Sequence, residues 1–238
     1  MVQSFVSHGF AFDDCEYLYI DNSEKNHYEA YAGINRFLTI AKGRYIIICH
    51  QDLLLLDDDR RKLDALLEEL DRLDPNWGVC GNAGGIHPGR VALRVSDPYG
   101  DNQFTERLPV RVRGLDENFL VVRRDANLAV SRDLHGFHLY GTDLCIIAHF
   151  LGYTAYVVDF HLRHLSPGPK GPTFDAVRSA MIAKYNRSLR PQMVTTTTTT
   201  VFLGRPVVLS AVLNSFVGRG IARRLGRFAA SRWPGGNS

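Results

Sequence analysis

The chain has no continuous apolar run of the roughly 18 residues that a membrane-spanning helix requires. It also has little net charge, +3 at pH 7, so a global electrostatic attraction to nucleic acid is weak. Its N-terminus lacks the basic stretch followed by an apolar one that marks a secretory signal peptide. These absences favour a cytoplasmic protein that does not bind nucleic acid.

Cysteine is scarce and scattered. Only four are present, they lie far apart, and none forms a CxxC pair: Cys15, Cys49, Cys80 and Cys145. A disulfide framework or a CxxC metal site is therefore not indicated, and we expect reduced thiols.

What the sequence does contain is enough apolar residues for one substantial core, 45% of 238. In the first part, strand-like and helix-like patterns alternate. The sequence predicts strands near 15–20, 44–49 and 77–85, and helices within 28–43 and 56–74. This alternation is typical of an α/β domain with a mostly parallel sheet flanked by helices.

The second part is less regular. Residues 85–118 read as a loop-rich insertion with short strands, followed by a strand near 118–125, a helix ending at Gly152, a further strand and a helix near 174–187. We expect one domain over 1–190, a threonine-rich strand or linker over 191–204, and a separate tail over 205–238.

The tail predicts a basic amphipathic helix. Apolar residues fall on one helical face and arginines on the other: Leu213, Val217, Ile221, Leu225 and Phe228 against Arg219, Arg223 and Arg227. Such a helix suits an anionic lipid surface, which would make the protein peripheral on the inner face of the membrane through 207–233. The alternative is a helix packed on the domain with a solvated basic side.

The stretch "CHQDL" (49–53) places an imidazole and a carboxylate directly after an apolar strand. Asp21, His50 and Asp52 all follow predicted strands, and ligands of α/β sheets bind beyond the carboxyl ends of strands. His50 and Asp52 could therefore hold a divalent ion that bridges to phosphates. The alternative is that Asp52 only starts the following helix and His50 lies at the edge of the core.

Two later features also have two possible interpretations each. Asp143 opens a helix and is either an N-terminal cap or a general base. His161 and His164 follow the next strand and are either metal ligands or ordinary loop histidines.

Taken in order, these pieces resemble the family 2 type of glycosyltransferases with the GT-A fold, and most of all a bacterial subgroup related to a protein of streptomycin biosynthesis. The resemblance covers roughly residues 15–186, and its pieces are "YIDNS", "YAGINRFLTIAKGRYIIICHQDLLLL", "LDENFLVVRRD", "HGFHLYGTDLC", "LGYTAYVVDFHLRHLSPG" and "KY". The "CHQD" and "GFHLYGTDLC" pieces are the most specific.

This resemblance implies a GT-A-like (Rossmann-like) enzyme that moves a sugar from a nucleotide diphosphate donor to an acceptor hydroxyl with inversion. The acceptor would be a glycan, a lipid-linked molecule or a small molecule. The ion would be Mn²⁺ or Mg²⁺. The resemblance assigns the following residues: Asp21, Asn35, Gln51 and Asp52 to the donor nucleotide; His50, Asp52 and His164 to the metal; Asp143 to catalysis; and Asp116, Glu117 and His138 to the acceptor.

The chain departs from the family pattern in three places. His50 replaces the first aspartate of the DxD metal motif, and Gly141 stands where the usual base would be. The family's first strand has no counterpart before the first helix. Three alternatives therefore stay open: a nucleotide-sugar-binding module without activity, a nucleotidyltransferase, which usually has a basic glycine-rich loop not found here, and a membrane-surface adaptor acting through the tail.

Overall fold

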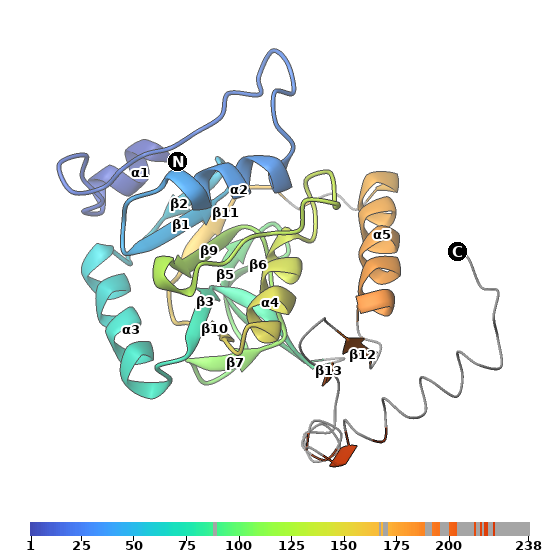
Figure 1. The fold of residues 1–238 in the computed structure, drawn as a ribbon. Coiled ribbons are helices and arrows are strands. Elements are labelled where there is room, and N and C mark those ends of the chain that lie inside the picture. The colour runs from blue at the N-terminus through green and yellow to red at the C-terminus, as the bar shows by residue number, and fades with distance from the viewer. Residues whose placement is uncertain are drawn as a thin grey trace. The chain divides into compact units, whose positions relative to one another are not determined.

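A computed structural model describes residues 1–87, 90–166, 168, 171–188, 192–195, 200–203, 212, 215, 217–218 and 221 (Figure 1). The chain divides into two compact units, Met1–Met181 and Ile182–Ser238. None of the helices in the described ranges combines the length and hydropathy needed to cross a bilayer. Of the predicted amphipathic helix of the tail, Val217 and Ile221 are described and exposed, whereas its three arginines lie outside the described residues.

The first sheet is mixed. Its strands lie in the order β1 (Tyr45–Cys49), β9 (Phe119–Arg123), β3 (Trp77–Gly81), β10 (Thr154–Val157) and β7 (Val110–Val112). Strand β9 is antiparallel to both β1 and β3, whereas β3 and β10 are parallel. The prediction of a mostly parallel sheet is therefore wrong: β1, β3 and β10 share one direction, but a strand from much later in the chain is inserted between the first two.

A second sheet has six strands and is also mixed. It contains β2 (Leu53–Leu55), β11 (Leu162–His164), β5 (Arg90–Asp97), β4 (Ala83–His87) and β8 (Gly114–Leu115), with β6 (Gly100–Phe104) paired to β5. Most of these strands come from the stretch 85–118, which was expected to contain short strands. Strands β2 and β11 pair antiparallel, with His164 opposite Leu53.

Five α-helices complete the described part: α1 (Val2–Ser7), α2 (Ala30–Ile40), α3 (Arg60–Leu73), α4 (Tyr140–Phe150) and α5 (Pro172–Ser188), with one 3₁₀ turn at Arg124–Ala126. Helix α3 begins after Asp59, whose side chain caps it by accepting a hydrogen bond from the Lys62 N–H. Helix α4 ends before Gly152, whose φ of +90° favours glycine. The predicted helices α2 to α5 are confirmed.

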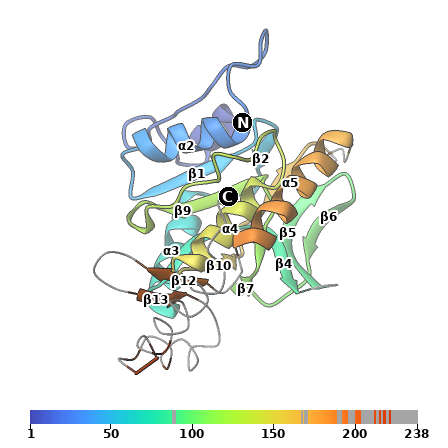
Figure 2. The ribbon, with the colours of Figure 1, turned by 45° about the vertical axis from the view of Figure 1, so that its right-hand side comes forward.

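Both faces of the first sheet are buried, which is why its strands are continuously apolar. Along β9, Phe119 and Val121 join one core cluster while Leu120 and Val122 join the other. Leu63, Leu67 and Leu70 of α3 belong to the cluster of Phe119 and Val121, and buried residues of α4 belong to the cluster of Leu120 and Val122. Figures 1 and 2 show where these two helices lie beside the sheet. Full burial of each leucine contributes about 2 kcal/mol. All four cysteines are free thiols, as expected.

The predicted strand near 15–20 does not form. Residues 15–22 have no regular structure, and Tyr19 is 84% exposed. Side chains hold this segment in place of a strand ladder: the Tyr17 hydroxyl donates to the Phe10 carbonyl, and Glu16 accepts from the Lys42 N–H. The β-favouring residues of this stretch thus lack a partner strand among the described residues.

The second unit contains a small hairpin. Strands β12 (Gln192–Thr195) and β13 (Thr200–Leu203) pair antiparallel, with Thr195 opposite Thr200. The described strands lie within the threonine-rich stretch for which a strand or linker was expected. The boundary between the two compact units falls within α5, after Met181.

Candidate metal centre

The turn 50–52 connects the two sheets, because β1 ends at Cys49 and β2 begins at Leu53. Backbone hydrogen bonds extend the strand ladders into this turn from both sides. The His50 N–H donates to the Asn118 carbonyl (3.0 Å), and the Leu165 N–H donates to the Asp52 carbonyl (3.1 Å). The "CHQD" turn is therefore fixed by both sheets.

His164 completes a cluster with His50 and Asp52. Its Nε2 atom lies 3.4 Å from Nδ1 of His50 and 3.4 Å from Oδ1 of Asp52. One ligand atom from each residue lies within 4.8 Å of the other two. The structure thus brings together the three residues that the sequence assigned to a metal.

The donor atoms of this cluster suit a cation. Asp52 Oδ1 is buried and accepts no hydrogen bond in the described part of the chain, which leaves a buried anionic oxygen facing the two imidazoles. Burial, followed by the neighbouring His164, lowers the pKa of His50. Burial works in the opposite direction on Asp52, but a hydrogen bond from Ser166 and the nearby His164 hold its pKa below the ordinary value. A neutral imidazole and an ionised carboxylate are the forms that bind metals.

A tyrosine lies behind His50. The Tyr140 hydroxyl is 2.9 Å from Nε2 of His50 and donates to the Glu117 carbonyl at 3.2 Å. Burial, then the charges of Glu117 and Asp116, raise the pKa of Tyr140 well above its ordinary value. The charges of Asp116 and His138 also act on the pKa of His50. Of the residues assigned to the acceptor, Glu117 contacts this tyrosine through its backbone carbonyl, and Asp116 precedes it in the chain.

Asp143 is not placed as a base. Its side chain is 0% exposed, and its two oxygens accept hydrogen bonds from the Ser131 N–H and hydroxyl, each at 2.7 Å. The carboxylate therefore anchors the segment around Ser131 to the first turn of α4 and is closed to an acceptor. At the neighbouring Gly141, a Cβ would lie 2.7 Å from the Leu115 carbonyl oxygen, so no acidic side chain fits there.

The residues assigned to the donor nucleotide are dispersed. Asp21 is exposed and accepts from the N–H and hydroxyl of Ser23, and these hydrogen bonds lower its pKa. Gln51 is exposed between the two metal candidates of the turn. The Asn35 amide is occupied by the backbone of Val130, donating to its carbonyl and accepting from its N–H. Of these, Gln51 and Asp52 belong to the cluster's turn, whereas the side chains of Asp21 and Asn35 are engaged by Ser23 and by the Val130 backbone.

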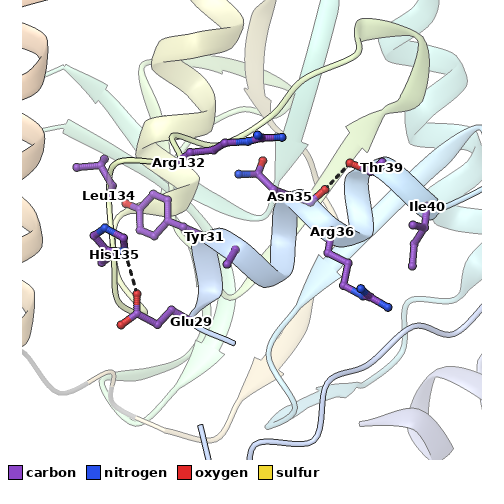
Figure 3. Close-up of a pocket in the computed structure, with 10 residues that line it drawn as sticks. Glu29, Tyr31, Asn35, Arg36, Thr39, Ile40, Arg132, Leu134 and His135 are labelled. Atoms are coloured by element: carbon purple, nitrogen blue, oxygen red, sulfur yellow. Dashed lines mark hydrogen bonds and ion pairs between the residues drawn. The ribbon is translucent and has the colours of Figure 1, made fainter. Parts of the chain in front are cut away.

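Asn35 also lines a separate cavity of about 530 Å³ between α2 and residues 132–135 (Figure 3). Glu29 and His135 point toward each other at one end, 3.3 Å apart, while Arg132 lies near Asn35. None of the three metal candidates lines this cavity. His161, the other late histidine, is buried and its Nε2 lies 2.9 Å from the Ser96 hydroxyl, so it is a core residue.

Glu117 gives the first expected result. Burial, followed by the charge of Asp116, raises its pKa to about 8, from an ordinary value of 4.5. A raised carboxyl pKa means that stability present below about pH 4.5 is lost as the pH rises toward 8. We expect the melting temperature of the wild type to fall relative to Glu117→Gln over this range, measured in EDTA. Glu68→Gln, on the exposed face of α3, should follow the wild type. If the melting temperature changed with pH in the same way in the wild type and in Glu117→Gln, the raised pKa of Glu117 would be contradicted.

No family model matches the chain. The protein described as "ATP synthase subunits region ORF 6" from Fuscovulum blasticum is 38% identical over 212 residues, covering 86% of this chain and 84% of that protein. Among solved structures, A197 from STIV is similar over 64% of this chain and 73% of its own, with 14% identity and a TM-score of 0.37. Neither description names a reaction or a ligand.

Proposed function

This chain belongs to the family of the ATP synthase subunits region ORF 6 protein of Fuscovulum blasticum, and we propose that it is a metal-assisted glycosyltransferase. In this proposal a GT-A-like domain transfers a sugar from a nucleotide diphosphate to an acceptor hydroxyl. The observation that carries it is the His50–Asp52–His164 cluster at the junction of the two sheets. The sequence pattern of "CHQD" and "GFHLYGTDLC" supports the sugar-nucleotide substrate.

The donor atoms favour Mn²⁺ over Mg²⁺ among the two expected ions. Mg²⁺ takes oxygen ligands in near-ideal octahedral geometry, whereas this cluster offers two imidazole nitrogens and one carboxylate oxygen. A bound divalent ion would supply Lewis acidity toward the leaving diphosphate. His50, Asp52 and His164 would hold it, and the exposed Gln51 would lie beside the donor.

The proton of the acceptor hydroxyl needs a carboxylate other than Asp143. The segment Asp116–Glu117 is the better candidate, because Asp116 is exposed and the Glu117 carbonyl contacts Tyr140 next to His50. A base must lie within hydrogen-bonding reach of the hydroxyl that it activates. We therefore place the acceptor on the side of the cluster formed by residues 116–117 and His138.

A second function is favoured by the buried Asp143 and by Gly141. A chain that keeps the metal cluster but has no acid at the usual base position would bind a nucleotide sugar without transferring it. This binding module and the transferase would bind the same donor, but only the transferase would transfer its sugar.

Calorimetric titration with nucleoside diphosphates, with and without Mn²⁺, tests the donor site. We expect binding that requires Mn²⁺ and is weaker with Mg²⁺, because of the two nitrogen ligands. Binding followed by sugar transfer to any member of an acceptor panel supports the transferase, and binding without transfer supports the module. A folded protein that binds no nucleoside diphosphate in Mn²⁺ would overturn both.

A further inference from the structure

Tyr140 occupies a constrained position at the start of α4. Its side chain is only 5% exposed, and the edge of its ring packs against Tyr31 with centroids 6.4 Å apart. The preceding Leu139 has a φ of +63°, a conformation that few residues other than glycine adopt. The hydroxyl is thereby held between His50 Nε2 and the Glu117 carbonyl.

The tyrosine hydroxyl has a single hydrogen to share between these two neighbours. A carbonyl oxygen can only accept, so the contact with Glu117 uses the hydroxyl hydrogen. The Tyr140 oxygen can then only accept from His50, which requires a hydrogen on Nε2 of the imidazole. Both contacts are satisfied together in this arrangement alone. In neutral His50, Nδ1 is then the nitrogen without a hydrogen.

The tautomer of His50 determines what the cluster can bind. With a hydrogen on Nδ1, His50 would donate toward Nε2 of His164, 3.4 Å away, and the two imidazoles would satisfy each other. With the hydrogen on Nε2, His50 Nδ1 carries a free lone pair, and it and Asp52 Oδ1 both lie 3.4 Å from Nε2 of His164. A cation satisfies these lone pairs at once.

We propose that Tyr140, with the Glu117 carbonyl behind it, is a positioning residue that fixes the Nε2–H tautomer of His50 and so makes Nδ1 a metal ligand. This inference rests on the ion of the proposed function but not on the nucleotide or the sugar. Outer-shell partners of metal-binding histidines set ring orientation and tautomer in this way.

The test combines NMR with metal titration on the full chain. Long-range ¹H–¹⁵N spectra of the metal-free protein report which nitrogen of His50 carries the hydrogen, with His50→Gln identifying the signal. We expect Nε2–H in the wild type and a mixture of tautomers in Tyr140→Phe. Mn²⁺ affinity, followed by the electron paramagnetic resonance of free Mn²⁺, should fall about 10- to 100-fold in Tyr140→Phe.

Two variants serve as controls. Glu117→Gln keeps the carbonyl that accepts from Tyr140, so the tautomer should not change. Tyr156→Phe removes a hydroxyl that donates to Asp74, away from the cluster, and should keep the wild-type Mn²⁺ affinity. If Tyr140→Phe does not fold, the NMR measurement of the His50 tautomer in the wild type still tests the positioning role.

The outcomes separate this inference from the proposed function. An Nδ1–H tautomer in the wild type, or unchanged Mn²⁺ affinity and tautomer in Tyr140→Phe, would overturn the positioning role even if nucleotides bind. Loss of Mn²⁺ affinity in Tyr140→Phe would support it even if no nucleoside diphosphate binds, in which case the transferase and the nucleotide-sugar-binding module both fail but the positioning role stands. A wild type that binds no Mn²⁺ would overturn both.

Discussion

Replacing Asp52 with alanine should weaken Mn²⁺ binding by more than about 100-fold, since loss of an outer-shell partner alone costs 10- to 100-fold. Asp52 supplies the one formal negative charge among the three candidate ligands, and its buried Oδ1 has no hydrogen-bond partner among the described residues. Binding of a nucleoside diphosphate that depends on Mn²⁺ should disappear with it. Calorimetry measures both effects.

Asp57→Ala is the matched control for this experiment. Asp57 follows β2, is exposed and lies outside the cluster, so its loss should leave Mn²⁺ affinity unchanged. In EDTA, Asp52→Ala should unfold within about 1 kcal/mol of the wild type, because no ion is lost and only a partly buried side chain is shortened. Equal Mn²⁺ affinity of Asp52→Ala and Asp57→Ala would exclude a metal at "CHQD".

Replacing Asp143 with alanine should lower the free energy of unfolding by about 3 kcal/mol, because it leaves buried donors without an acceptor. The carboxylate is fully buried and accepts from the N–H and the hydroxyl of Ser131. Urea denaturation, followed by the fluorescence of the buried Trp77, measures the loss. Nucleoside diphosphate affinity should stay at the wild-type value under conditions where the variant is folded.

Ser131→Ala separates the two hydrogen bonds. It removes the hydroxyl donor and keeps the N–H, so we expect a smaller loss, about 1 kcal/mol. Asp143→Asn provides the opposing test. If Asp143→Asn were as stable as the wild type but had no turnover, Asp143 would be the general base, as one of the two interpretations of the sequence had it.

Local pattern was enough for the parts of the fold that follow one periodicity. The helical spacing of leucines such as Leu63, Leu67 and Leu70 predicted α3, and these three are buried. Which strands pair across long stretches of the chain is not visible in any local periodicity. Nothing in 119–123 shows that this strand would lie between β1 and β3 and run against both. Strand-like residues at 15–20 could not reveal that their segment is held by side chains and has an exposed tyrosine.

In the candidate site, too, local pattern identified some residues and could not identify those that depend on distant contacts. His50 and Asp52 were recognisable because they follow a strand, and His164 because its segment resembles a known family. Whether Asp143 is a cap or a base stayed open, because an acid at a helix start has the same pattern whether it is exposed or, as here, fully buried. Tyr140 was missed, because one tyrosine at a helix start has no spacing that connects it to a histidine far away in the chain.

The pairing of β2 with β11 has a consequence for the folding of the chain. It brings His164 next to a turn that lies 114 residues earlier, so the complete cluster exists only after these segments have met. An ion held there would act as a removable cross-link between the early and late halves of the domain. At 100 times its dissociation constant, a ligand specific for the folded state adds about 2.7 kcal/mol to the free energy of unfolding. The folded fraction of this protein would then depend on the supply of the ion in the cell.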